Sequence, residues 1–214
     1  MTTTAINAQT RAAAIEPSLP DAGRLGMWIF LATEVLFFGG LLVAYAYGRT
    51  HWPDGFATAS RHTDVLLGTL NTGVLLTSSA VVALAVTAAE SSSHRRWTAW
   101  LLFAAAALGV IFLGIKGLEY RQDWNENLFP GPAFALADAR GAELFYMLYY
   151  VMTALHGVHL TIGVTALAVF GEAWRRRRPW ACAKRVEIAA LYWHFVDIVW
   201  IVLYPLLYLV NRHA

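Results

Sequence analysis

The chain has 214 residues, of which 58% are hydrophobic and only 14% are charged. A soluble domain of this size rarely carries so many apolar residues, so the composition excludes an ordinary globular fold and favours a membrane protein. The net charge is +2 and the basic residues gather in a few short loops, a pattern that argues against a nucleic-acid partner.

The N-terminal segment, residues 1–24, is polar and lacks the apolar core of a cleaved signal peptide. We interpret it as a polar extension that precedes a transmembrane domain over residues 25–214. A helix needs about 20 mostly apolar residues to cross a bilayer. Five segments meet that requirement: Leu25–Tyr47, Val65–Ala89, Trp97–Leu118, Ala142–Phe170 and Val186–Val210. The predicted fold is therefore an all-α bundle of five transmembrane helices, the last of them interrupted by Pro205.

The distribution of Lys and Arg predicts the orientation of this bundle, because these residues accumulate in cytoplasmic loops. Ten of the 16 lie before the first segment or in the loops after the second and fourth segments: Arg11, Arg24, Arg95, Arg96, Arg175, Arg176, Arg177, Arg178, Lys184 and Arg185. We therefore expect a cytoplasmic N-terminus and, after an odd number of crossings, a C-terminus outside. The run from Arg175 to Arg178 is interpreted as a topology signal, with contact to anionic lipid headgroups or a neighbouring subunit as the alternative.

Ionisable residues inside the segments are candidates for function, because a charge at the bilayer centre costs about 2.5–3.5 kcal/mol on insertion scales. Glu34 lies near the middle of the first segment. It either stays protonated or pairs with a group on another helix. His156 and His159 are the best partners available, one helical turn apart in the fourth segment. We interpret the histidines as interhelical polar contacts, with a lipid- or proton-linked role and, last, a metal or haem ligand as alternatives.

Two further pairs share this one-turn spacing. Lys116 and Glu119, near a helix end, can pair with each other or extend toward water. His194 and Asp197 can meet, since bonding reduces the cost of burying either one alone, and we favour interhelical or intersubunit hydrogen bonding for them over direct chemistry. Similar cross-helix bonds are available to Asn71, Thr72, Ser78 and Ser79. Close helix approach is expected at glycines that include Gly39, Gly40, Gly73, Gly109, Gly114 and Gly163.

Taken together, these residues resemble subunit III of haem–copper oxidases, the family of the cytochrome c and quinol oxidases. The resemblance rests on stretches that occur here in the family's order: GMWIFLATEVLFFGG, LNTGVLLTSS, KGLEY, HGVH and WHFVDIVWIVLYPL. The chain is similar to the shorter bacterial form with five helices, which lacks the first two helices of the seven-helix form.

The resemblance implies an accessory subunit in the bacterial cytoplasmic membrane, with no haem, copper or catalytic residue of its own. Such a subunit would brace catalytic subunit I, hold phospholipid and support proton uptake during oxygen reduction. Glu34 matches the family's membrane glutamate, His156 and His159 match its HG-x-H pair, and His194 with Asp197 match its WH-x-x-D turn. Haem and copper would then belong to partner subunits, which take electrons from cytochrome c in preference to quinol. Membership of a respiratory supercomplex stays open.

Three alternatives differ in their predictions. A related accessory subunit of a nitric oxide reductase shares the helix pattern, and neighbouring genes would distinguish it. An independent transporter also carries ionisable residues at membrane depth, but the sequence shows no inverted repeat. A membrane enzyme with its own haem predicts a Soret absorbance from the isolated chain.

Overall fold

The computed structural model describes residues 22–91 and 95–209, and the regular structure in these residues is helical. The helices are α2 (Ala22–His51), α3 (Pro53–Arg61), α4 (Val65–Glu90), α5 (Thr98–Asn125), α6 (Ala142–Arg175), α7 (Ala183–Tyr204) and the π-helical turn η1 (Pro205–Leu209). Within the described ranges, five helices are long and apolar enough to cross a membrane: α2, α4, α5, α6 and α7 with η1. The predicted all-α fold is confirmed, whereas most of the predicted N-terminal extension lies outside the described residues.

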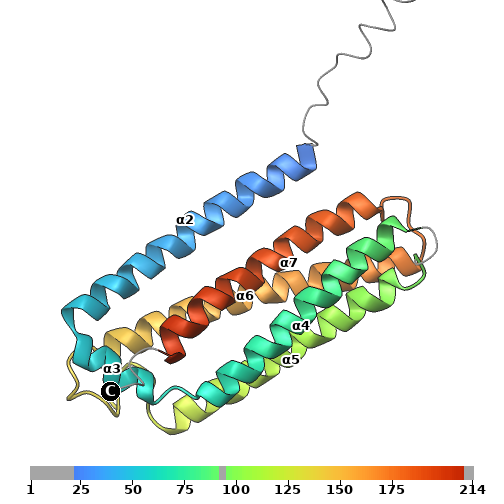
Figure 1. The fold of residues 1–214 in the computed structure, drawn as a ribbon. Coiled ribbons are helices and arrows are strands. Elements are labelled where there is room, and N and C mark those ends of the chain that lie inside the picture. Colours follow the sequence, from blue (N-terminus) through green and yellow to red (C-terminus); the bar gives the residue numbers. More distant parts are fainter. Residues whose placement is uncertain (1–21, 92–94, 210–214) are drawn as a thin grey trace, which may run out of the picture.

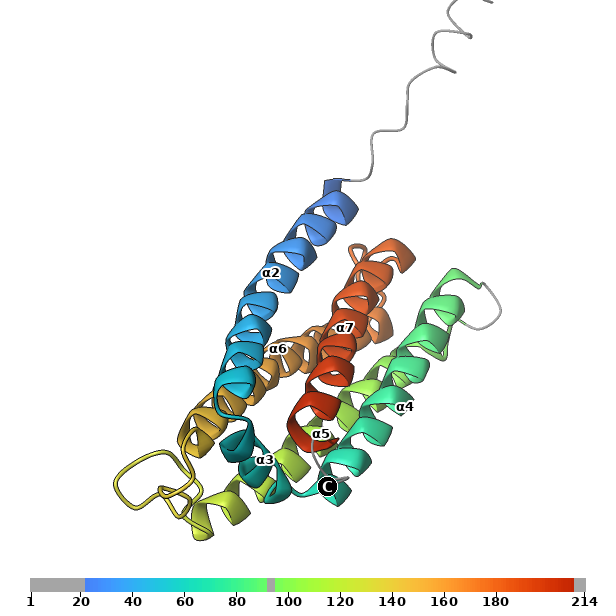
Figure 2. The same ribbon diagram turned by 60° about the vertical axis from the view of Figure 1, so that its left-hand side comes forward.

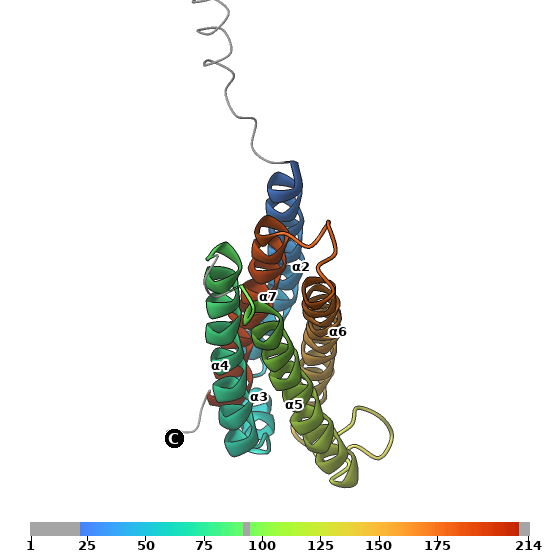
Figure 3. The same ribbon diagram turned by 90° about the vertical axis from the view of Figure 1, so that its right-hand side faces the viewer.

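Helices α4 to α7 form a four-helix bundle, and α2 lies outside it. Around the bundle, α4 packs on α5, α5 on α6, α6 on α7 and α7 on α4. Helix α2 runs along α7 and α6, away from α4 and α5 (Figure 1). The turned views show α2 beside α7 (Figure 2) and α5 between α4 and α6 (Figure 3). Helix α2 is thus the least enclosed of the membrane spans, with 11% of its apolar window buried.

The helix ends follow local chemistry more than hydropathy. Helix α4 begins where the Asp64 side chain accepts a hydrogen bond from the backbone N–H of Leu67 at 3.1 Å, a normal N-cap. Helix α5 continues to Asn125, seven residues beyond the predicted end at Leu118. The polar stretch after Leu118 remains helical, and a hydropathy criterion cannot detect such a helix once it leaves the apolar layer.

Helix α3 and the loop between α5 and α6 close one end of the bundle. The sequence did not predict them as a unit. Helix α3 starts at Pro53, a residue suited to the first helical turn because it needs no backbone donor there. The loop between α5 and α6 meets this region at Gly141, whose φ of +93° favours glycine. A β-carbon on Gly141 would lie 2.4 Å from that of Trp52, so the close approach also requires glycine.

One tryptophan marks the centre of the bundle. Trp193 of α7 is fully buried, with its indole between Gly109 of α5 and Gly163 of α6. A β-carbon at either glycine would come within 3 Å of the ring. These two glycines confirm the expectation of close packing, since in a bilayer helices associate through tight contacts and not through exclusion of water. The expectation is not met within the chain at four other glycines, where a β-carbon would meet no atom within 4 Å: Gly39, Gly40, Gly73 and Gly114.

Candidate functional site

The Glu34 carboxylate meets His159 between α2 and α6. Oε2 of Glu34 lies 3.1 Å from Nε2 of His159, and the two side chains are 18% and 14% exposed. Nδ1 of His159 lies 2.8 Å from the carbonyl oxygen of Leu155. Because a carbonyl only accepts, Nδ1 carries a hydrogen. A single further proton then lies between Nε2 and Oε2, as a neutral acid beside a neutral imidazole or as an ion pair.

His156 does not take part in this contact, although it is one turn from His159. Its ring is buried against Phe112 and Trp200, at centroid distances of 5.6 and 5.1 Å. Neither ring nitrogen has a hydrogen-bond partner within residues 22–91 and 95–209. The sequence therefore offered two possible partners for Glu34, and the rotation of α6 selects His159.

The predicted contact between His194 and Asp197 is not formed. Nδ1 of His194 lies 2.7 Å from the Ser79 hydroxyl on α4, and neither carboxylate oxygen of Asp197 has a hydrogen-bond partner in the described part of the chain. The Ser79 hydroxyl also lies near the Asp197 carboxyl group, but no hydrogen bond of normal geometry joins them. His194 turns to the neighbouring helix because a hydroxyl at bonding distance is available there.

This contact belongs to a set of three side-chain hydrogen bonds that join α4 to α7, which we call the α4–α7 ladder. Its members are Thr69 with Tyr204 at 2.6 Å, Thr72 with Trp200 at 3.0 Å, and Ser79 with His194 at 2.7 Å. Ser78 donates instead to the carbonyl of Ala105 on α5. The predicted cross-helix role is thus observed for Thr72, Ser78 and Ser79, whereas the buried amide of Asn71 has no partner among the described residues.

Lys116 and Glu119 form a buried polar group, which we call the Lys116 cluster. Nζ of Lys116 lies 3.1 Å from Glu119 Oε2 and donates to the hydroxyls of Tyr149 and Tyr208 at 2.8 and 2.5 Å. Both hydroxyls donate in turn to Glu119 Oε1, at 2.8 and 2.6 Å. The lysine is 6% and the glutamate 1% exposed. The alternative that these side chains extend toward water is therefore wrong.

Sequence reasoning missed three members or neighbours of this cluster. Tyr149, Tyr208 and Asp123 come from α6, η1 and the end of α5, and Asp123 Oδ2 lies 3.4 Å from the Tyr149 hydroxyl. A signal was present in the spacing, because Asp123 follows Glu119 by one helical turn and so shares its face. Nothing in the sequence indicates that tyrosines from two other helices meet there.

The four arginines at the end of α6 differ in their contacts. Arg175 and Arg176 both bond to Glu172, Arg175 with its nitrogens at 2.8 and 2.9 Å from the two carboxylate oxygens. Arg177 and Arg178 are exposed and form no ion pair with any residue in the described ranges. Half of the run thus remains available to an anionic surface.

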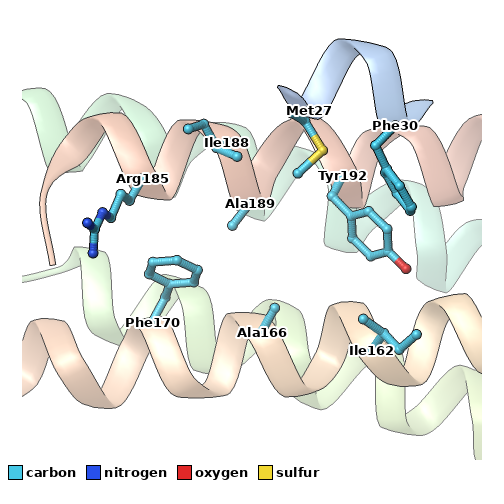
Figure 4. A pocket seen from close by; sticks show the side chains of 9 residues that line it. All are labelled: Met27, Phe30, Ile162, Ala166, Phe170, Arg185, Ile188, Ala189 and Tyr192. Atoms are coloured by element: carbon cyan, nitrogen blue, oxygen red, sulfur yellow. The ribbon is translucent and has the colours of Figure 1, made fainter. Parts of the chain in front are cut away.

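An apolar pocket of about 350 Å³ opens between α2, α6 and α7, near the arginine-rich end. Figure 4 shows its lining: Met27, Phe30, Ile162, Ala166, Phe170, Arg185, Ile188, Ala189 and Tyr192. Arg185 is the only charged member of this lining and lies toward one end of it (Figure 4). The Tyr192 hydroxyl donates to the backbone carbonyl of His159 at 3.0 Å, so the pocket adjoins the Glu34–His159 contact.

No group of three or more His, Cys, Asp or Glu side chains able to hold a metal occurs in the part of the chain that the structure describes. The fold defines a multi-pass helical membrane protein, in which Glu34 and Lys116 each contact an ionisable partner within the chain. Comparison with known proteins specifies the class further. The model of the family "Cytochrome c oxidase subunit III" matches residues 16–211. The chain belongs to the cytochrome c oxidase subunit III family.

Individual relatives agree with this assignment. Cytochrome c oxidase subunit 3 of Thermostichus vulcanus is 34% identical over 200 residues, which cover 90% of each chain. The protein of the same name from Synechocystis sp. is 34% identical over 194 residues, covering 89% of this chain and 76% of the relative. Haem–copper oxidase subunit I+III of Aeropyrum pernix is 29% identical over 209 residues, covering 91% of this chain and 23% of that protein. The chain is thus a component of an oxidase complex, and family membership implies association with other oxidase subunits.

Proposed function

We propose that the chain is the accessory subunit III of a cytochrome c oxidase in a bacterial cytoplasmic membrane. In this role it stabilises catalytic subunit I, holds phospholipid and supports proton uptake during oxygen reduction, while haem and copper reside in the partner subunits. The observation that carries the proposal is the Glu34–His159 contact at membrane depth beside an apolar pocket.

The proton-linked part of the proposal follows from the hydrogen positions. One proton is shared between Glu34 and His159, and either residue can hold it without breaking the contact. The partial exposure of both side chains leaves the pair within reach of a proton donor or acceptor outside the chain. Such a pair can pass the proton between Nε2 and Oε2 without moving either side chain, which suits a position near a proton-uptake route.

The lipid-linked part follows from the pocket. Its lining is apolar except for Arg185, and it lies at the end of the molecule that carries Arg177 and Arg178. An acyl chain suits the apolar wall, and a phosphate suits a guanidinium. The wall formed by α2 is held at this end by an ion pair of 2.5 Å between Arg24 and Glu187.

Glu34→Gln tests the proton-linked role in the purified complex. The amide can still donate to Nε2 of His159, so assembly is expected to be retained, but the shared proton is lost. We expect fewer protons to be taken up per oxygen molecule consumed, as measured with a pH indicator during turnover. Glu90→Gln changes an exposed carboxylate at the end of α4 and is the control, which should leave this proton-to-oxygen ratio unchanged. Equal ratios in the two variants would contradict the role.

Ala166→Phe tests the lipid-linked role, because the larger side chain occupies the pocket between α2, α6 and α7. We expect fewer phospholipid molecules to remain in the purified complex, counted by native mass spectrometry. Ala104→Phe, at an exposed position of α5, adds the same group outside the pocket. Equal lipid retention in the two variants would show that this pocket holds no lipid.

A further inference from the structure

Asp123 is a buried carboxyl group close to water, in the polar end of α5. Among residues 121–127 it alone is buried, at 6% exposure, and its neighbours Gln122 and Trp124 are exposed. It lies five residues past Leu118, about 7.5 Å at a rise of ~1.5 Å per residue. The loop after α5 is tied to this position, because the N–H of Leu128 donates to the backbone carbonyl of Asp123 at 2.9 Å.

The charges around Asp123 do not balance when every acid is ionised. The charged groups close to it in the described residues are Lys116 and Glu119, both on its own helix. The three ammonium hydrogens of Lys116 are used by Glu119 and by the hydroxyls of Tyr149 and Tyr208. The lysine thus already balances Glu119. An ionised Asp123 would add a buried negative charge that no cation offsets, which is costly in the interior.

The other titratable groups that face Asp123 supply no positive charge either. All of them are phenols, which ordinarily titrate at about pH 10 and are neutral below it. They come from three helical elements, α5, α6 and η1: Tyr120, Tyr146, Tyr149, Tyr150 and Tyr208.

The Tyr149 hydroxyl connects Asp123 to the Lys116 cluster. Its single hydrogen can point to Glu119 Oε1 at 2.8 Å or to Asp123 Oδ2 at 3.4 Å. Since O–H···O bonds are usually about 2.5–3.0 Å long, the hydrogen belongs to Glu119. The nearby Tyr150 hydroxyl forms no hydrogen bond within the described ranges. Asp123 therefore lacks the short donor contacts that would stabilise a carboxylate.

We propose that Asp123 is a proton-binding site that holds a proton at neutral pH and releases it to the water at this end of the bundle as the pH rises. Loss of the proton places a second negative charge beside Glu119 and draws the Tyr149 hydrogen away from it. Because the Lys116 cluster joins α5, α6 and η1, this end of the bundle then becomes less stable.

The direction of the pH effect follows from proton linkage. At neutral pH the folded chain keeps a proton on Asp123 that the unfolded chain releases, so raising the pH favours unfolding. The inference rests on contacts within this chain and is independent of the proposed role in an oxidase.

Infrared spectroscopy of the purified complex tests the protonation state. A protonated carboxyl group has a C=O stretching band that a carboxylate lacks, and the band shifts in D2O. We expect this band in the difference spectrum between the parent and Asp123→Asn at neutral pH. Asp138→Asn, which changes an exposed carboxyl group in the loop after α5, should give carboxylate bands. Carboxylate bands for Asp123 as well would overturn the proposal, whether or not a cation is bound there.

Thermal unfolding of the same complexes tests the link to stability. From mildly acidic to mildly alkaline pH, we expect the midpoint temperature to fall more steeply for the parent than for Asp123→Asn, because asparagine has no proton to lose. Asp138→Asn should follow the parent. Asparagine imitates the neutral acid, so Asp123→Asn should also assemble normally. A slope equal to that of the parent, or failure to assemble at neutral pH, would contradict the proposal.

Discussion

Two residue pairs with the same spacing show how much spacing alone can predict about side-chain contacts. Lys116 and Glu119 are bonded at 3.1 Å, whereas His194 and Asp197 are not, although each pair lies one turn apart. Spacing permits a contact along one helix, but a neighbouring helix can offer a better partner. For Lys116, the hydroxyls of Tyr149 and Tyr208 bond to both members of the pair, and the contact between Lys116 and Glu119 is retained. For His194 the competing serine draws the imidazole away from Asp197.

Lys116→Met should be strongly destabilising. Without the ammonium, Glu119 keeps a buried charge that no cation balances, and breaking a buried ion pair in this way costs about 3–5 kcal/mol. We expect a clear drop in the midpoint temperature of unfolding of the detergent-solubilised complex, followed by circular dichroism.

The double substitution Lys116→Met with Glu119→Gln is the matched control. It removes both charges while the glutamine still accepts from Tyr149 and Tyr208, so most of the lost stability should return. A double variant as unstable as the single one would show that packing of the lysine chain, and not charge balance, determines the stability of the Lys116 cluster.

At the level of helices, the five spans could be predicted because each is mostly apolar over at least 20 residues, and at most ends the structural bounds differ from the predicted ones by only a few residues. Helix α3 was not predicted, since its nine residues give no membrane signal. The interruption at Pro205 was predicted, and the structure changes there from α-helix to the π-turn η1. The consequence of this turn, the burial of Tyr208 in the Lys116 cluster, depends on the packing of other helices and could not be read from the sequence.

Helix α2 depends on a few polar contacts because so little of it is buried. One of them joins the buried Tyr45 hydroxyl to the Leu206 carbonyl of η1 at 2.6 Å. Tyr45→Phe should lower the stability by about 0.6 kcal/mol, and by up to ~1.7 kcal/mol if the carbonyl finds no other donor. Tyr47→Phe is the control, since Tyr47 is 58% exposed on the same helix. Equal midpoint temperatures of the two variants would show that this bond does not hold α2.

For the molecule as a whole, the two ends of the bundle differ in charge. The loop between α6 and α7 carries Arg177 and Arg178 without ion pairs to the rest of the described chain, whereas Arg175 and Arg176 bond to Glu172. Paired or not, all four arginines count toward orientation, because the bias depends on the number of basic residues near the helix ends. The expected arrangement therefore has this loop in the cytoplasm and the loop over residues 126–141 outside.

Cys182 provides a direct test of this arrangement, because it is the single cysteine of the chain and is exposed in the loop between α6 and α7. A membrane-impermeant maleimide should leave Cys182 unlabelled in intact spheroplasts and label it in inverted membrane vesicles. Ala137→Cys in a Cys182→Ala background should behave in the opposite way, since Ala137 is exposed in the loop between α5 and α6, beyond the other end of the spans. The two sites control for each other, because damaged membranes would label both in both preparations. Labelling of Cys182 in intact spheroplasts with protection of the new cysteine would reverse the orientation, and the arginine-rich end with its apolar pocket would then face the outside.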